Sequence, residues 1–168
     1  MGIVNEFLGK HCKDKVTGFE GICTYITEWM YGCAAIAITS DYVDPEHTSK
    51  SSIFFSPRLE ILDDGVAGQF EIKSDEPKYF GKICQDKIHK SIVGICVGRI
   101  SMLGASEQYG VEIQPEDLSK ESRIVWLDEG RIELFENQED AINPEDISGD
   151  NPGGVLDPDF YPTSSLLL

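Results

Sequence analysis

The sequence predicts an all-β protein with two tandem five-stranded barrels of the small SH3-like or Tudor-like type, followed by an extended C-terminal arm. Three observations support this prediction: the chain repeats itself, each copy consists of short β-rich segments separated by turns, and the end of the chain is acidic and rich in Pro and Gly. The first barrel is expected at 1–62, a linker at 63–78, the second barrel at 79–135 and the arm at 136–168.

An internal repeat defines the two copies. Residues 9–16 read G-K-H-C-K-D-K-V and return at 81–88 as G-K-I-C-Q-D-K-I, an offset of 72. The offset then becomes 73, so that G-I-C at 21–23 recurs at 94–96. The change of offset means that the second copy has one extra residue between these blocks. When a fold is duplicated, such insertions are expected in turns. Two copies are too few for a solenoid, and each copy is therefore expected to close on itself as a small domain.

Five strands are expected in each copy. In the first copy, the segments rich in Val, Ile, Thr and aromatic residues are 12–16, 22–29, 33–39, 53–55 and 59–62. The first two form a hairpin across a turn that contains Gly. The Ala-rich segment 33–39 is also compatible with a helix, but its counterpart 107–113 alternates and has a central Gly, which favours a strand. The last two segments recur at 124–127 and 131–135.

The order of these segments favours a barrel. A long loop precedes a tight final turn in each copy, and closure is the usual way to remove the edges of a small antiparallel sheet. The alternative is a pair of open sheets that pack as one two-layer sandwich. A unit of this size buries only about 60% of its unfolded surface, so the copies are expected to pack on each other or on a partner.

The formal charge of −16 is unevenly distributed, because the segment 136–168 has eight acidic residues and no Lys or Arg. Contact with nucleic-acid phosphates requires clustered Lys and Arg, which argues against direct nucleic-acid binding. A basic protein surface is the electrostatic complement, and an acidic face that serves only solubility is the alternative. The sequence has no 18-residue apolar run and no apolar N-terminal signal, so we expect no membrane partner and synthesis in a reducing cytoplasm.

The arm contains Asn-Pro, Asp-Pro and Tyr-Pro steps and lacks the apolar periodicity of a core, so it is expected to be extended when alone. Candidate anchors to a neighbouring subunit, which is either another protein or a second copy in a homo-oligomer, are Val155, Leu156, Phe160, Tyr161, Leu166, Leu167 and Leu168. A frayed tail without a partner is the alternative.

Cysteine is the reactive residue type that recurs in both copies. Cys12 and Cys23 of the first copy match Cys84 and Cys96 of the second, whereas Cys33 aligns with Ser106. The members of each pair flank the first turn almost symmetrically, which places them opposite each other on neighbouring strands. One interpretation is a redox pair or a cross-strand disulfide. The favoured interpretation is two small buried hydrophobic side chains in a reducing compartment.

We predict no catalytic residue, cofactor or metal site. The sequence has no C-x-x-C, no Ser/His/Asp grouping and no phosphate loop, and the three histidines do not recur at matched positions. Asp14 and Asp86 do recur, beside the first turn of each copy. An Asp beside a turn most often accepts hydrogen bonds from backbone N–H groups, so we expect a structural role for both.

Three aromatic residues, Tyr25, Trp29 and Tyr31, are candidates for partner binding because they gather at the end of the second strand and its turn. The second copy has Gly, Met and Gly at these positions. An aromatic pocket is therefore expected only in the first copy. Packing in the core or between the barrels is the favoured alternative.

Two sets of motifs resemble a group of short, uncharacterised proteins encoded by tailed bacteriophages. In the first copy they are K-D-K-V-T-G-F-E-G-I at 13–22 and E-W-M-Y-G-C at 28–33. In the second copy they are Q-Y-G-V at 108–111 and W-L-D-E-G-R-I-E-L at 126–134. Each half of the chain looks like one such unit. The group is not a known enzyme family, so the resemblance implies a phage origin more than an activity.

Three functions are compatible with these features. The leading hypothesis is a non-enzymatic phage structural protein of the virion, a capsid decoration or cement protein that binds neighbouring protein subunits through its two barrels and its arm. The second is an intracellular phage protein that sequesters a host factor or a small signalling molecule in the aromatic pocket. The third is a thiol-dependent enzyme that uses the cysteine pairs.

Overall fold

The structure, a computed structural model, describes residues 2–40, 50–72, 75–115 and 119–135. Within these ranges the chain forms ten β-strands, one short α-helix and three 3-10 turns. The predicted all-β class is confirmed. In the described part of the chain, no helix has the length and apolar character needed to cross a membrane.

The two halves contain the same series of strands. The elements of the first half are α1 (Ile3–Phe7), β1 (His11–Asp14), β2 (Glu20–Trp29), β3 (Ala35–Thr39), β4 (Ser51–Phe55), η1 (Ser56–Arg58) and β5 (Leu59–Asp63). The connecting segment contains η2 (Ala67–Gln69). The elements of the second half are β6 (Ile83–Asp86), β7 (Val93–Met102), β8 (Gln108–Ile113), β9 (Arg123–Asp128), η3 (Glu129–Arg131) and β10 (Ile132–Leu134).

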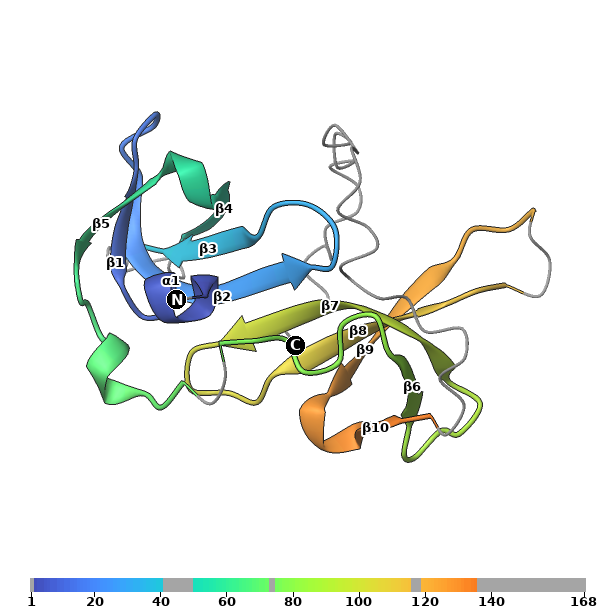
Figure 1. Cartoon of the computed structure of the whole chain (residues 1–168). Coiled ribbons are helices and arrows are strands. Elements are labelled where there is room, and N and C mark those ends of the chain that lie inside the picture. The colour runs from blue at the N-terminus through green and yellow to red at the C-terminus, as the bar shows by residue number, and fades with distance from the viewer. Residues whose placement is uncertain (1, 41–49, 73–74, 116–118, 136–168) are drawn as a thin grey trace.

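The strands pair in the same order in both halves. The order is β5-β1-β2-β3-β4 in the first half and β10-β6-β7-β8-β9 in the second, and every pairing is antiparallel. Strands β2 and β7 are long enough to pair with two neighbours on one edge. The first part of each strand pairs with a strand of its own half, and the last part pairs with the other half. Figure 1 shows them side by side between the two halves.

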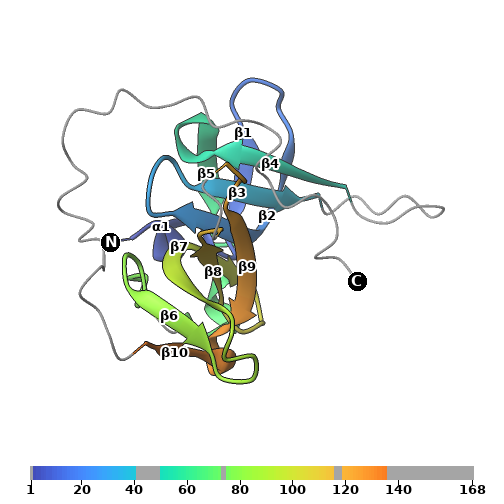
Figure 2. The same ribbon diagram turned by 90° about the vertical axis from the view of Figure 1, so that its right-hand side faces the viewer.

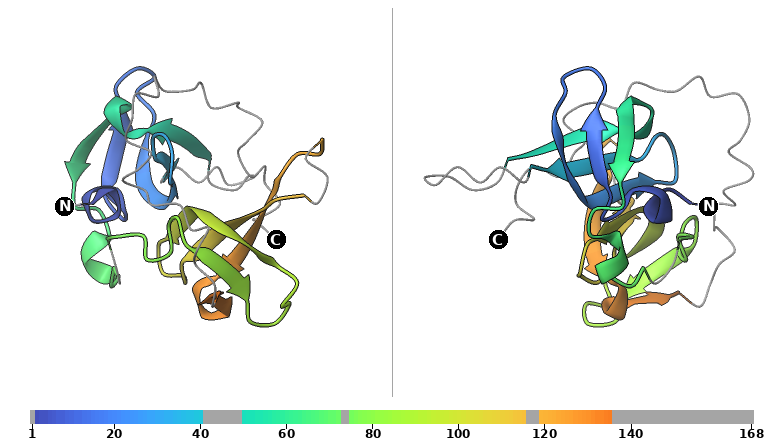
Figure 3. Two further views of the ribbon diagram at one scale, coloured as in Figure 1. Left: turned by 45° about the vertical axis from the view of Figure 1, so that its right-hand side comes forward. Right: turned by 90° about the vertical axis from the view of Figure 1, so that its left-hand side faces the viewer.

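The two separate closed barrels expected from the sequence are not confirmed. Because β2 pairs with β7, the ten described strands form one continuous sheet, and this sheet is not closed. Sequence patterns report which face of a strand is apolar, whereas the choice of a partner for a strand edge depends on backbone groups that every residue carries. The views in Figures 2 and 3 show the halves as two curved lobes that meet at this pairing.

Each half retains its own hydrophobic core. The first core consists of Val4, Phe7, Leu8, Cys12, Cys23, Ile26, Ile36, Ile38, Phe54 and Leu59. The second consists of Tyr79, Cys84, Cys96, Tyr109, Val111, Leu127 and Ile132. Most members are counterparts in the repeat, such as Phe54 and Leu127. The duplicated positions are therefore mainly core positions.

A buried ion pair fixes the turn between β1 and β2. Asp14 is fully buried and accepts hydrogen bonds from Arg58 Nε at 2.9 Å and Nη2 at 2.7 Å. It also accepts one from the backbone N–H of Thr17 at 2.8 Å. The hydrogen bonds from Arg58 hold the pKa of Asp14 well below its usual range, against the opposing effect of burial.

The second half repeats this arrangement. Asp86 is fully buried, pairs with Arg131 and accepts a hydrogen bond from the backbone N–H of Ile88 at 3.0 Å. Burial alone would raise the pKa of Asp86, but the hydrogen bonds from the Arg131 side chain and the Ile88 backbone outweigh it and lower the pKa. The structural role predicted for Asp14 and Asp86 is confirmed, and it includes an Arg partner.

Candidate functional site

The most elaborate arrangement of polar side chains lies where β2 meets β7. We call this region, 25–29 of β2 and 98–102 of β7, the junction. Thr27 lies opposite Ile100 at its centre, and Glu28 lies opposite Arg99. Thr27 and Ile100 are also counterparts in the repeat, so the two strands meet about an approximate two-fold axis that passes between them.

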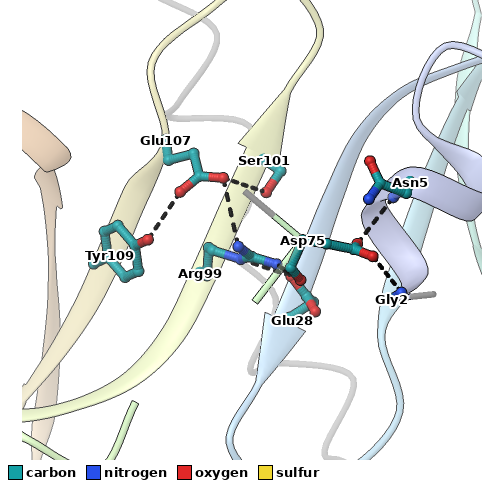
Figure 4. A network of polar contacts seen from close by, with 8 residues as sticks. All are labelled: Gly2, Asn5, Glu28, Asp75, Arg99, Ser101, Glu107 and Tyr109. Carbon is teal, nitrogen blue, oxygen red and sulfur yellow. Dashed lines mark hydrogen bonds and ion pairs between the residues drawn. The ribbon is translucent and has the colours of Figure 1, made fainter. Parts of the chain in front are cut away.

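Arg99 is the centre of a polar network beneath the junction. Its side chain is fully buried and donates from Nε to Glu28 Oε2 at 2.7 Å and from Nη2 to the backbone oxygen of Asp75 at 2.9 Å. A longer ion pair of 3.5 Å joins Nη1 to Glu107 Oε1. Figure 4 shows that these partners come from β2, from the connecting segment and from the strand-β8 side of the second half.

Glu107 extends the network into the second half. It is 9% exposed and accepts hydrogen bonds from the Tyr109 hydroxyl at 2.8 Å and the Ser101 hydroxyl at 3.4 Å. Burial, and after it the hydrogen bond to Glu107, raises the pKa of Tyr109, so the phenol remains a donor. Burial also raises the pKa of Glu28, although Arg99 acts in the opposite direction. The network thus holds two carboxylates close to one guanidinium.

Asp75 connects the network to the beginning of the chain. Its carboxylate accepts hydrogen bonds from the backbone N–H groups of Gly2 and Asn5, at the start of α1. Its backbone oxygen accepts from Arg99. Ile72, three residues earlier, packs against the first core. The connecting segment expected as a linker therefore binds both halves.

The chemistry of this network is structural. The Arg99 side chain is 0% exposed, so a ligand in solvent has no access to its guanidinium. Every buried polar side-chain atom in the described ranges has a hydrogen-bond partner. A fully satisfied network of this kind orders the groups that it joins and favours a single arrangement of the two halves.

The three aromatic residues predicted as a candidate pocket have different surroundings in the structure. Trp29 is half-buried and packs edge-on against Trp126 of β9, with 5.5 Å between the ring centroids. Both rings lie over Gly98, where an added Cβ would approach within about 3 Å of each ring. Trp29 therefore packs between the halves, which was the favoured alternative. Tyr25 is half-buried opposite Met102 of β7, and Tyr31 is 45% exposed beyond the end of β2.

The four repeated cysteines lie in the two cores as free thiols. Cys12, Cys23, Cys84 and Cys96 are all 0% exposed. Cys12 pairs in register with Gly21, so the members of a pair share a buried face as diagonal neighbours and do not lie directly opposite each other. Burial raises the pKa of Cys12 to about 11, and contact with Cys84 together with burial raises that of Cys96.

We expect native alkylation with iodoacetamide near neutral pH to modify one thiol per chain rapidly and the other four only through unfolding. The fast thiol is Cys33, the exposed one, which serves as an internal reference. The four buried thiols lack solvent access, and burial also raises the pKa of Cys12 and Cys23. Mass spectrometry of the time course, with a urea-unfolded sample in which all five react, measures the difference. Rapid modification of a buried thiol would restore the thiol-dependent enzyme as a hypothesis.

Sequence reasoning missed the central residue of this site. Arg99 occupies the repeat position that holds Ile26 in the first half, where the side chain belongs to the core. A charged residue aligned with a core Ile is the signal that would have identified it. The candidate anchors of the arm, including Phe160, Tyr161, Leu166, Leu167 and Leu168, lie outside the described residues.

The described residues contain no group of three or more His, Cys, Asp or Glu side chains arranged to hold a metal ion. Comparisons with known protein families, curated proteins and solved structures gave no match for this chain.

Proposed function

We propose that the protein is a non-enzymatic structural component of a tailed-phage particle, a decoration or cement protein that bridges two neighbouring subunits. The observation that supports this most directly is a pair of exposed apolar side chains at matched positions. Val16 is 75% exposed in the β1–β2 turn, and its counterpart Ile88 is 66% exposed in the β6–β7 turn. The resemblance to phage-encoded units supports the same proposal.

These two turns lie at opposite ends of the molecule, on either side of the junction (Figures 1 and 3). A second matched pair, Ile61 at 38% and Leu134 at 50% exposure, lies on the last strands of the two halves. Solvent-exposed large apolar residues that recur in both halves are candidates for contact with a partner. Two related contacts on one chain suit a bridge between subunits that are themselves equivalent.

We also propose that each half is a variant of the SH3-like or Tudor-like five-stranded barrel, opened at the junction. The support is the strand order shared by the halves and the 3-10 turn, η1 or η3, before each last strand. The C-terminal arm, by its acidic sequence, is proposed to contact a neighbouring subunit.

The first test is mass spectrometry of purified particles of the phage that encodes the chain. The proposal expects the protein at a fixed ratio to the major capsid subunit, and its absence from purified particles would refute the proposal. The second test adds purified protein to particles that lack it. Because two linked contacts gain about 10²–10⁴ in avidity over one, Val16→Asp or Ile88→Asp is expected to lower occupancy at least tenfold, and the double variant to abolish it.

Matched controls exchange the counterparts, Val16→Ile and Ile88→Val. Both retain an apolar side chain in the turn and are expected to bind like the unchanged protein. Circular dichroism of all variants checks that the fold is retained. Equal occupancy of the Asp double variant and the controls would show that these turns are not the contacts.

A further inference from the structure

The junction has a symmetry that raises a question of specificity. Register pairs across it are Tyr25 with Met102, Ile26 with Ser101, Thr27 with Ile100, Glu28 with Arg99 and Trp29 with Gly98. In the repeat, residues 25–29 correspond to 98–102. Each strand therefore meets its own counterpart in the geometry of a two-fold interface, in which a surface is complementary to itself. Backbone pairing alone would equally join two copies of β2 or two copies of β7.

Charge favours the pairing of β2 with β7 over the pairing of two identical strands. In the same register, two β2 strands would place Glu28 opposite Ile26 twice, and neither carboxylate would meet a cation. Two β7 strands would place Arg99 opposite Ser101 twice. A buried charge left without its partner is strongly unfavourable. In the observed pairing Glu28 meets Arg99, and the uncharged Ile26 meets Ser101.

Side-chain size also favours the pairing of β2 with β7 over the pairing of two identical strands. Trp29 lies over Gly98, and there is no room for a Cβ at that position. Two β2 strands would instead place Trp29 opposite Tyr25 at both ends. The glycine that receives the tryptophan is present only in β7. Charge and size therefore favour the pairing of a first half with a second half.

We propose that the junction is a heterotypic pairing surface, with Glu28 and Arg99 as its specificity-determining residues, and that its partner in trans is a second copy of this chain. The first half of one copy fits the second half of another, so two copies can exchange halves as a domain-swapped dimer. The intact chain prefers its own halves because the connection gives them a high effective concentration. This inference is independent of the proposed function.

The test uses two full-length variants whose junctions are mismatched in cis and matched in trans. The first carries Glu28→Arg. The second carries Arg99→Glu together with Glu107→Gln, which removes the carboxylate next to the introduced one. Each variant is unfolded in urea and refolded alone or in an equimolar mixture, and native mass spectrometry measures the species. In a swapped heterodimer one junction has the original ion pair and the other has the reversed pair.

The expected result is monomer of lowered melting temperature from each variant alone, and a 1:1 heterodimer with a recovered melting temperature from the mixture. A single chain with all three substitutions is expected to be a folded monomer, because its reversed pair is matched in cis. The control mixes the Glu28→Arg chain with a Glu107→Gln chain, a combination that offers no second matched junction and should give no heterodimer.

Three outcomes would overturn the proposal. One is a mixture that contains only the species seen for the separate variants. Another is as much dimer from a variant alone as from the mixture. The third is loss of folding in the chain that carries all three substitutions. Because refolding starts from urea, variants that do not fold alone still give a decisive result when mixed.

Discussion

Replacing Arg99 by Ala is expected to lower the free energy of unfolding by about 3–5 kcal/mol, the usual cost of removing one partner of a buried ion pair. The substitution leaves Glu28 without its guanidinium partner and removes the donor to the Asp75 backbone oxygen. It also leaves a cavity, because the Arg99 side chain is fully buried. Urea unfolding followed by circular dichroism measures the loss.

The matched control is Arg123→Ala, which removes an exposed Arg from the same half. Substitutions of this kind change stability by about 0.5 kcal/mol or less. The double variant Glu28→Gln with Arg99→Met removes both members of the Glu28–Arg99 pair. Its loss of stability should therefore be smaller than the summed losses of the two single variants. Equal losses for Arg99→Ala and Arg123→Ala would show that the buried network contributes no stability.

The local structure of this protein could be predicted well from the sequence, because the repeat gives two aligned segments for each strand and one can decide where the other is ambiguous. The strand assigned at 33–39 is one example, since the Ala-rich first copy alone is compatible with a helix. Its counterpart alternates and favours a strand, and β3 and β8 are the result. The shared Asp beside the first turn was correctly assigned to a structural role for the same reason.

The junction was not predicted, and the reason is physical. Pairing between β2 and β7 uses backbone N–H and C=O groups, which leave no trace in the side-chain pattern. The side-chain evidence was present but ambiguous: Trp29 is compatible with an exposed pocket or with packing between halves, and only the position of Gly98 and Trp126 decides between them. Arg99 was missed because an isolated Arg in a strand sequence is usually exposed.

The duplicated and the diverged positions have different roles. Counterparts that stay alike, such as Asp14 and Asp86 or Cys12 and Cys84, maintain each half. Diverged counterparts gather where the halves meet, and Ile26 and Arg99 are the clearest pair. Divergence at a two-fold interface converts two interchangeable surfaces into two complementary ones. The duplicated chain thereby specifies one arrangement of its halves. Two identical units would not, because each of their surfaces could pair with a copy of itself.

Replacing Gly94 by Ala is expected to lower the free energy of unfolding by about 1–3 kcal/mol or more, because no space exists for the added methyl group. A Cβ at this position would lie under 3.0 Å from the carbonyl oxygen and carbon of Glu112 on β8. Its counterpart Gly21 has the same relation to Thr39 on β3. The obstacle is backbone in both cases, so a rotation of a side chain gives no relief. We therefore expect the close approach of the paired strands to require the glycine of the G-I-C motif in both halves.

Gly130→Ala is the matched control for this prediction, because it adds the same methyl group in the same half where no atom lies within 4 Å of the added Cβ. Its backbone conformation also accepts Ala. The control should therefore leave the free energy of unfolding unchanged or raise it by about 0.4–1 kcal/mol, because Ala lowers the conformational entropy of the unfolded chain. Urea midpoints of the two variants measure the contrast. If Gly94→Ala matches Gly130→Ala, the close approach of β7 and β8 is not a constraint on the repeat, and the shared glycine requires another explanation.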